Sequence, residues 1–100
     1  MMSDRSEYPI EIRLNERKLT RIIIDQHYKE KHSETMNDRL IIVLVKTLDG
    51  ESFPVETKKG EFEFFTVEPV EWKKKPYRVI LMLCVSDDFV GVINAFRVNL

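Results

Sequence analysis

The chain has little of what marks secreted, membrane-spanning or disordered proteins. It contains one cysteine, three glycines and four prolines in 100 residues. Cys84 has no partner in the chain, which excludes an internal disulfide and favours a reducing compartment. No apolar run approaches the roughly 20 residues that cross a bilayer, and the N-terminal segment MMSDRSEYP lacks the apolar region of a secretory signal. We therefore expect a cytoplasmic protein that binds no membrane.

An excess of charge of one sign is also missing. Sixteen Lys and Arg stand against seventeen Asp and Glu, and the formal net charge is -1. The whole molecule therefore offers no general attraction to nucleic acid, and any site for a polyanion must be a local patch. A chain of 100 residues that is 43% hydrophobic is typical of one globular domain. We expect a single domain over residues 1–100, with residues 1–8 flexible.

The motifs of several common enzyme classes are absent. The chain has no G-x-S-x-G, no Gly-rich phosphate loop, no HExxH and no CxxC. Its two histidines, His27 and His32, are five residues apart rather than the four that place two ligands on one helical face. We therefore expect no metal site and no cofactor.

Hydrophobic patterning is what the sequence does offer, beginning with two strands. Residues 10–14 alternate isoleucine and leucine with charged side chains, which is typical of a half-buried strand. Residues 18–25 end in three isoleucines and an aspartate, and β-branched side chains favour a second strand. Asn15 and Glu16 between them indicate a turn. The pattern predicts an N-terminal hairpin.

Two helices are expected next. Asp25 can cap a short polar helix over residues 25–34, and Asn37 or Asp38 can cap a second helix over residues 38–48, with Gly50 as its stop. A buried strand is the alternative for the continuous apolar run at residues 40–43. Helical spacing extends over about three turns, which favours helix. The expected buried stripe is Leu40, Ile41, Leu44, Val45 and Leu48.

The C-terminal third predicts three strands, at residues 62–72, 76–86 and 89–98, joined as an antiparallel meander. The middle strand is apolar on both faces and should be central. Pro69 should lie on an edge or at a bulge, and the doublet Phe64-Phe65 indicates another bulge. The expected fold class is therefore α+β, with the helices on one face of a mainly antiparallel sheet.

The segment DQHYKEKH is the densest group of reactive side chains. His27 and Lys31 are four apart on the expected helix, as are Tyr28 and His32, and Lys29 lies between them. Imidazole can both accept and donate a proton near neutral pH. The alternative is that this helix is simply a solvated face.

A second basic cluster lies at WKKKPYR. Lys73, Lys74, Lys75 and Arg78 stand beside two aromatic residues, a mixture that can follow a nucleic-acid backbone and stack on its bases. The alternative is a hairpin tip whose lysines protect a sheet edge from aggregation. Arg97 is an isolated cation on the last expected strand.

These segments together resemble the RelE-like toxin families of the barnase-like ribonuclease superfamily, which are small bacterial proteins. The resemblance covers roughly residues 18–98 and depends on IIIDQHYKEKH opening a helix, NDRLIIVLVKTLDG as the next helix, and YRVILMLCVSDDFVGVINAFRV as a closing hairpin. These are matches of pattern and include no invariant motif.

The resemblance implies RNA cleavage without a metal ion, by proton transfer to and from the ribose and phosphate oxygens. It implies His27 or His32 as the proton-transfer group, assisted by Tyr28. Lys29, Lys31 and Arg97 would contact phosphate, and a protein antitoxin would be the partner. The competing hypothesis is a non-enzymatic interaction domain that binds a protein or a second copy through the strand at residues 62–72. Its exposed aromatic stripe would be Phe62, Phe64, Phe65 and Trp72.

Overall fold

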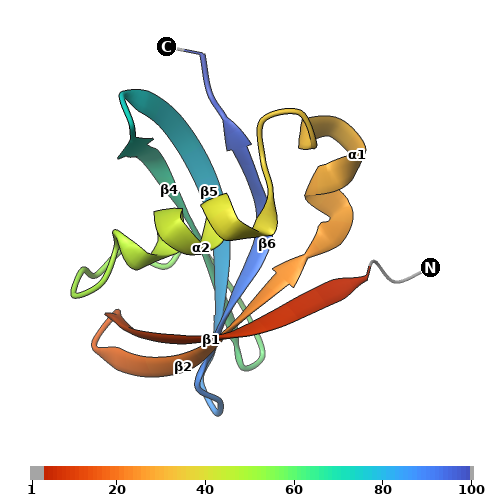
Figure 1. The fold of residues 1–100 in the computed structure, drawn as a ribbon. Coiled ribbons are helices and arrows are strands. Elements are labelled where there is room, and N and C mark those ends of the chain that lie inside the picture. The colour runs from red at the N-terminus through yellow and green to blue at the C-terminus, as the bar shows by residue number, and fades with distance from the viewer. Residues whose placement is uncertain (1–3, 100) are drawn as a thin grey trace.

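The computed structural model describes residues 4–99 and is an α+β fold, as expected from the sequence (Figure 1). A six-stranded mixed sheet is accompanied by two short α-helices and one turn of 3-10 helix. The elements are β1 (Arg5–Leu14), β2 (Arg17–Asp25), η1 (Gln26–Tyr28), α1 (Lys29–His32), α2 (Asp38–Lys46), β3 (Thr57–Lys59), β4 (Phe62–Trp72), β5 (Lys75–Cys84) and β6 (Phe89–Arg97).

The strands lie in the order β1-β2-β6-β5-β4-β3. All neighbours are antiparallel except β2 and β6, which are parallel, with Ile22 opposite Val90. Neither the parallel pair nor the short strand β3 was expected from the sequence. The parallel pair is decisive for the architecture, because it joins the N-terminal strands to the C-terminal ones in one continuous sheet.

Strand β1 begins at Arg5, which pairs with Asp25 of β2. The expectation of a flexible segment over residues 1–8 is therefore wrong for residues 5–8, and residues 1–3 lie outside the described part of the chain. The turn between β1 and β2 uses Asn15 and Glu16, with φ angles of 52° and 63°. Two consecutive positive φ angles are those of the tight hairpin turn whose twist matches that of the flanking strands.

Strand β4 contains a single irregularity, between Val67 and Val70, where its pairing with β5 shifts register. Pro69 lies in this bulge, as expected, because proline cannot donate a ladder hydrogen bond. The bulge expected at Phe64-Phe65 is wrong: these residues pair in register with Met82 and Leu81.

Helix α2 confirms the helical alternative for residues 40–43. The side chain of Asn37 accepts a 2.8 Å hydrogen bond from the amide of Leu40 and so caps the first turn. Ile41, Leu44 and Val45 are fully buried. Figure 1 shows α2 crossing one face of the sheet, in front of β4 and β5, whereas α1 lies to the side near β6. The hydrophobic core lies between α2 and the sheet.

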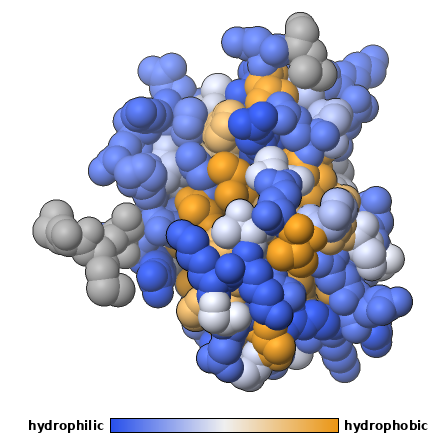
Figure 2. All heavy atoms as spheres, turned by 180° about the vertical axis from the view of Figure 1, so that it is seen from behind, coloured by the Kyte–Doolittle hydropathy of each residue, from blue (hydrophilic) through white to orange (hydrophobic). Residues whose placement is uncertain are grey.

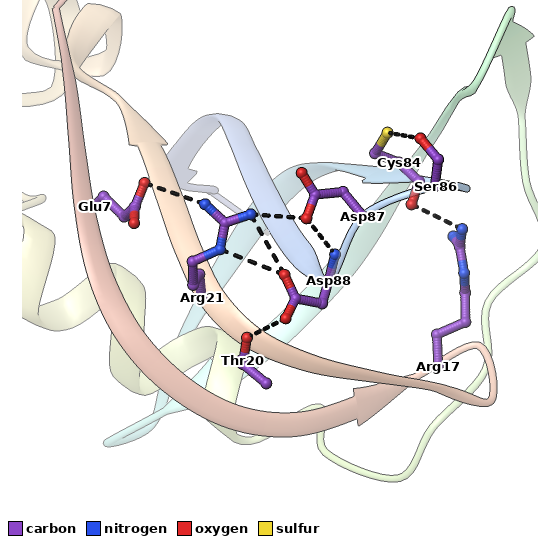
Figure 3. Close-up of polar contacts among 8 residues, drawn as sticks. All are labelled: Glu7, Arg17, Thr20, Arg21, Cys84, Ser86, Asp87 and Asp88. Atoms are coloured by element: carbon purple, nitrogen blue, oxygen red, sulfur yellow. Dashed lines mark hydrogen bonds and ion pairs between the residues drawn. The ribbon is translucent and has the colours of Figure 1, made fainter.

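A cluster of charges around Arg21 joins β2 to the turn between β5 and β6 (Figure 3). The guanidinium of Arg21 lies 2.8 Å from Asp87 and 3.4 Å from Asp88, and reaches Glu7 of β1 at 3.5 Å. The backbone amide of Thr20 donates to the carbonyl of Asp88 at 2.8 Å. These contacts hold the start of β6 beside β2 and thereby set the parallel register.

Candidate functional site

The polar segment after β2 presents one of the two histidines to solvent. Asp25 accepts a 2.8 Å hydrogen bond from the amide of His27 and caps η1, as expected. The Nδ1 atom of His27 lies 3.0 Å from a carboxylate oxygen of Glu30, and both side chains are more than half exposed. Lys29 and Gln26 line the same shallow depression. The segment therefore offers an accessible imidazole oriented by a carboxylate.

Tyr28 faces the opposite way, into the core. It is 1% exposed, and its hydroxyl donates a 2.6 Å hydrogen bond to Oδ1 of Asp38. Tyr8 donates at 2.6 Å to Oδ2 of the same carboxylate, and the side-chain amide of Gln26 donates to both oxygens. Tyr28 thus holds α2 against β2 and η1. The implied role in stacking on RNA or donating a proton to it does not fit this position.

The environment of Asp38 shifts several pKa values. Burial alone would raise the pKa of Asp38, but hydrogen bonds from Tyr28, Tyr8 and Gln26 outweigh burial and hold it below its usual value. Burial, followed by the bond to Asp38, raises the pKa of the Tyr28 phenol well above its ordinary value. The bond to Asp38 likewise raises the pKa of Tyr8. From the sequence Asp38 was considered only as a helix cap, and this polar network was missed.

His32 and Arg97 belong to different surroundings. The His32 ring stacks on Phe96, with centroids 4.9 Å apart, and Arg78 lies over the same Phe96 ring at 5.6 Å. Arg97 follows Phe96 on β6, and successive strand residues point to opposite faces. Within residues 4–99, no side-chain hydrogen bond or ion pair joins any two of the four residues proposed for catalysis. The structure does not bring His27, His32, Tyr28 and Arg97 together.

The lysine cluster forms the tip of the β4–β5 hairpin. Lys73 and Lys74 are its two turn residues, with φ angles of 51° and 66°, and Lys75 begins β5. Arg97 lines a shallow hollow beside Lys74 and Lys75. Arg78 is separate from them, because its guanidinium pairs with Glu68, with Nε 2.8 Å from the carboxylate. Lys31, also proposed to contact RNA, is exposed on α1.

The face of the sheet opposite the core carries a second set of apolar side chains. Figure 2 views the molecule from the side opposite to that in Figure 1 and shows this face, on which hydrophobic residues are bordered by hydrophilic ones. In β5, Ile80 and Met82 alternate with the core residues Val79 and Leu81 and are only partly buried. Met82 pairs with Phe64 of β4 and with Gly91 of β6. The same face also carries Ile23 of β2, Phe62 of β4, and Phe89 and Ile93 of β6. We call this set the open face.

A hollow of about 540 Å³ lies on the open face, toward the end of the sheet that carries the β5–β6 turn. Gly91 forms its floor between Ile23 on one side and Met82 on the other. Phe62 and Ile93 line it and are 39% and 37% exposed. A methyl group placed on Gly91 would lie 3.0 Å from Cε of Met82. The absence of a side chain at residue 91 therefore leaves room for Met82, which packs over it at the edge of the hollow.

Charged residues surround this hollow, and most are acidic. Asp25, Glu61 and Asp87 line it together with Arg5. Asp87 pairs with the guanidinium of Arg21, which also pairs with Glu7 and Asp88. The same guanidinium lies 5.5 Å from the centroid of the Phe89 ring. The sequence showed none of this arrangement, because its charged members come from β1, β2, the β3–β4 turn and the β5–β6 turn.

The aromatic stripe expected along β4 is wrong in two of its four members. Phe65 is 1% exposed and stacks on Phe53 in the core, with ring centroids 5.8 Å apart. Trp72 is half-buried and packs against the core. Phe62 and Phe64 lie on the open face instead. Strand alternation divides the four residues, because neighbours in a strand project to opposite sides of the sheet.

No protein-family model, curated protein or solved structure that was compared with the chain matches it. In the described part of the chain, no three His, Cys, Asp or Glu side chains gather as metal ligands. No helix among residues 4–99 is long and apolar enough to span a membrane. The functional assignment therefore depends on the chemistry of the surfaces described above.

Proposed function

We propose that this protein is a non-enzymatic protein-binding domain whose open face receives the partner. The hollow at Gly91 carries this proposal. It is the place where an uncovered sheet face is both apolar and concave. A concave apolar surface with a polar border is the usual form of a protein or peptide interaction site.

Gly91 itself is the strongest support. It lies in β6 between β2 and β5, and it is not among the residues with a positive φ angle. The backbone therefore does not require glycine there, whereas glycine inside a strand weakens the strand. Its Cβ position points to the open face and away from the core, where the end of the flexible Met82 side chain is its nearest neighbour, at 3.0 Å. Close approach of a ligand is a common reason for glycine at such a position.

The substitution Gly91→Val tests the proposal because it fills the hollow. Valine favours strands, and the nearest atom, Cε of Met82, is the end of a flexible side chain that can move. The fold should therefore persist, as circular dichroism would show. Thr66→Val is the matched control: Thr66 lies on the same side of the sheet but outside the hollow.

Affinity capture from an extract of the source cells gives the readout. Partners retained by the wild type and Thr66→Val, and lost from Gly91→Val, would support the open face as the binding surface. Equal capture by all three proteins would contradict it, as would the absence of any partner of the wild type.

A second candidate is a RelE-like, metal-independent ribonuclease held by an antitoxin in the cytoplasm. One observation favours it: His27 is exposed, and Glu30 lies 3.0 Å from its Nδ1 atom, the arrangement of a general base oriented by a carboxylate. It also draws on the order of elements that the resemblance implies, a hairpin, two helices and a meander with the helices on one face. Lys29 would be its nearest phosphate contact.

A further inference from the structure

We infer that the partner of the open face is a cationic amphipathic segment, one that places an apolar side chain in the hollow and lysine or arginine at its border. This inference depends on the proposed function and adds the chemistry of the partner. It arises from the charges that line the hollow at Gly91.

The border of the hollow carries more carboxylates than guanidiniums. Three carboxylates and one guanidinium line it, an excess of two negative charges, against a net charge of -1 for the whole chain. The lining carboxylates are Asp25, Glu61 and Asp87, and Arg21, which pairs with Asp87, also pairs with Glu7 and Asp88. Lys73, Lys74 and Lys75, at the tip of the β4–β5 hairpin, lie at the other end of β5 from Cys84 and Asp87. Beyond a Debye length of about 8 Å their charge is largely screened from the hollow.

The carboxylates differ in how strongly they are already engaged. Asp87, Asp88 and Glu7 share the Arg21 guanidinium, and Asp25 caps η1. Glu61 makes no ion pair within residues 4–99 and stands exposed in the β3–β4 turn, next to Phe62. A cationic side chain of the partner can therefore pair with Glu61 without breaking an existing ion pair. Phe62 provides adjacent apolar contact for the same segment.

The same charges argue against a second copy as the occupant. Two open faces packed against each other would bring two acidic borders together, and juxtaposed like charges cost binding energy and suppress that pairing. A cationic partner instead gains from complementary potential, which chiefly increases the association rate and makes binding weaken with salt.

Two defined peptides test the inference. One is a fluorescein-labelled 12-residue peptide of alternating leucine and lysine, and the other has glutamate in place of every lysine. Anisotropy titrations at low and at physiological salt should show binding of the lysine peptide alone, weakening several-fold as salt rises. Gly91→Val should lower its affinity at least tenfold, and Glu61→Lys several-fold. Thr66→Val should leave it unchanged.

Glu34→Lys provides the control for charge, because it makes the same change in net charge as Glu61→Lys at an exposed residue that does not line the hollow. Equal weakening by Glu34→Lys and Glu61→Lys would show only a general effect of charge and would overturn the inference.

Other outcomes separate this inference from the proposed function. If both peptides bind and Gly91→Val abolishes both, the open face binds partners but does not select cations, so the inference fails while the proposed function stands. If neither peptide binds, or if Gly91→Val changes nothing, both fail. A dimer in sedimentation of the wild type that is lost in Gly91→Val would identify a second copy as the occupant and overturn the cationic partner.

Discussion

The hydroxyl of Tyr28 and the carboxylate of Asp38 meet at 2.6 Å in the interior, between the short helical segment after β2 and the first turn of α2. The contact joins two elements that share few others. It also decides how the segment from Gln26 to His32 is presented, because anchoring Tyr28 inward leaves His27 and Glu30 facing solvent. The polar helix is therefore held in place by its one buried side chain.

Removal of this hydroxyl should destabilise the fold. Tyr28→Phe leaves a carboxylate with one donor fewer, and a hydrogen bond to a charged group contributes about 1.5–3 kcal/mol. We expect a loss of that size in the free energy of unfolding, measured by urea denaturation. Tyr77→Phe is the control: Tyr77 is also buried, but its hydroxyl makes no hydrogen bond within residues 4–99. Equal effects of the two substitutions would show that the Asp38 bond contributes nothing.

Asp38 should also make stability depend on acid pH. Its pKa in the folded protein is lowered, so its stabilising contribution is complete above the unfolded value of about 3.9 and is lost as the pH falls through the folded value. Asp38→Asn should therefore be less stable than the wild type at pH 6, and the difference should shrink toward pH 2. A difference that is constant across this range would contradict the assigned role.

The two phenylalanines Phe62 and Phe65 should respond in opposite ways to truncation. Phe65→Ala removes a core ring and should cost about 3–5 kcal/mol of stability. Phe62→Ala acts on a ring that is 39% exposed on the open face and should change stability far less while weakening binding of the lysine peptide. Urea denaturation and anisotropy together provide both quantities. If Phe62→Ala binds the peptide as well as the wild type, this ring is not part of the binding surface.

The local features of this fold could be predicted from the sequence because they depend on neighbouring residues. Asp25 and Asn37 cap the helices as expected, and Pro69 lies at the bulge in β4. The parallel pairing of β2 with β6 depends on contacts between Arg21 and Asp87, which are 66 residues apart. No local pattern reveals such a contact, and β3 is too short to show a period.

Only the β4 part of the site, Phe62 and Phe64, was predicted as an exposed surface. The other apolar side chains of the open face alternate with core residues on several strands, so their runs were attributed to burial. Gly91 within FVGVINAF could have been questioned, because glycine inside a strand pattern suggests close backbone approach. The two histidines were candidates because imidazole can transfer protons, but His27 lies beside Glu30 whereas His32 stacks on Phe96.

The ribonuclease candidate makes a clear prediction in cells. If it is correct, expression of the wild-type chain in bacteria should arrest growth with cleavage of total RNA, and the double variant His27→Ala, His32→Ala should do neither. The protein-binding proposal predicts normal growth and intact RNA for both proteins. His32→Ala alone separates the two histidines, because its ring packs on Phe96 and not beside Glu30.

Mapping of the bound lysine peptide by ¹H–¹⁵N spectra of the labelled protein tests the central claim most directly. We predict that shift changes will be confined to the open face and its border, with the largest at Ile23, Phe62, Met82 and Gly91. Changes centred on His27 to His32 or on the β4–β5 turn, with the amide of Gly91 unmoved, would contradict the assignment of the open face as the binding surface.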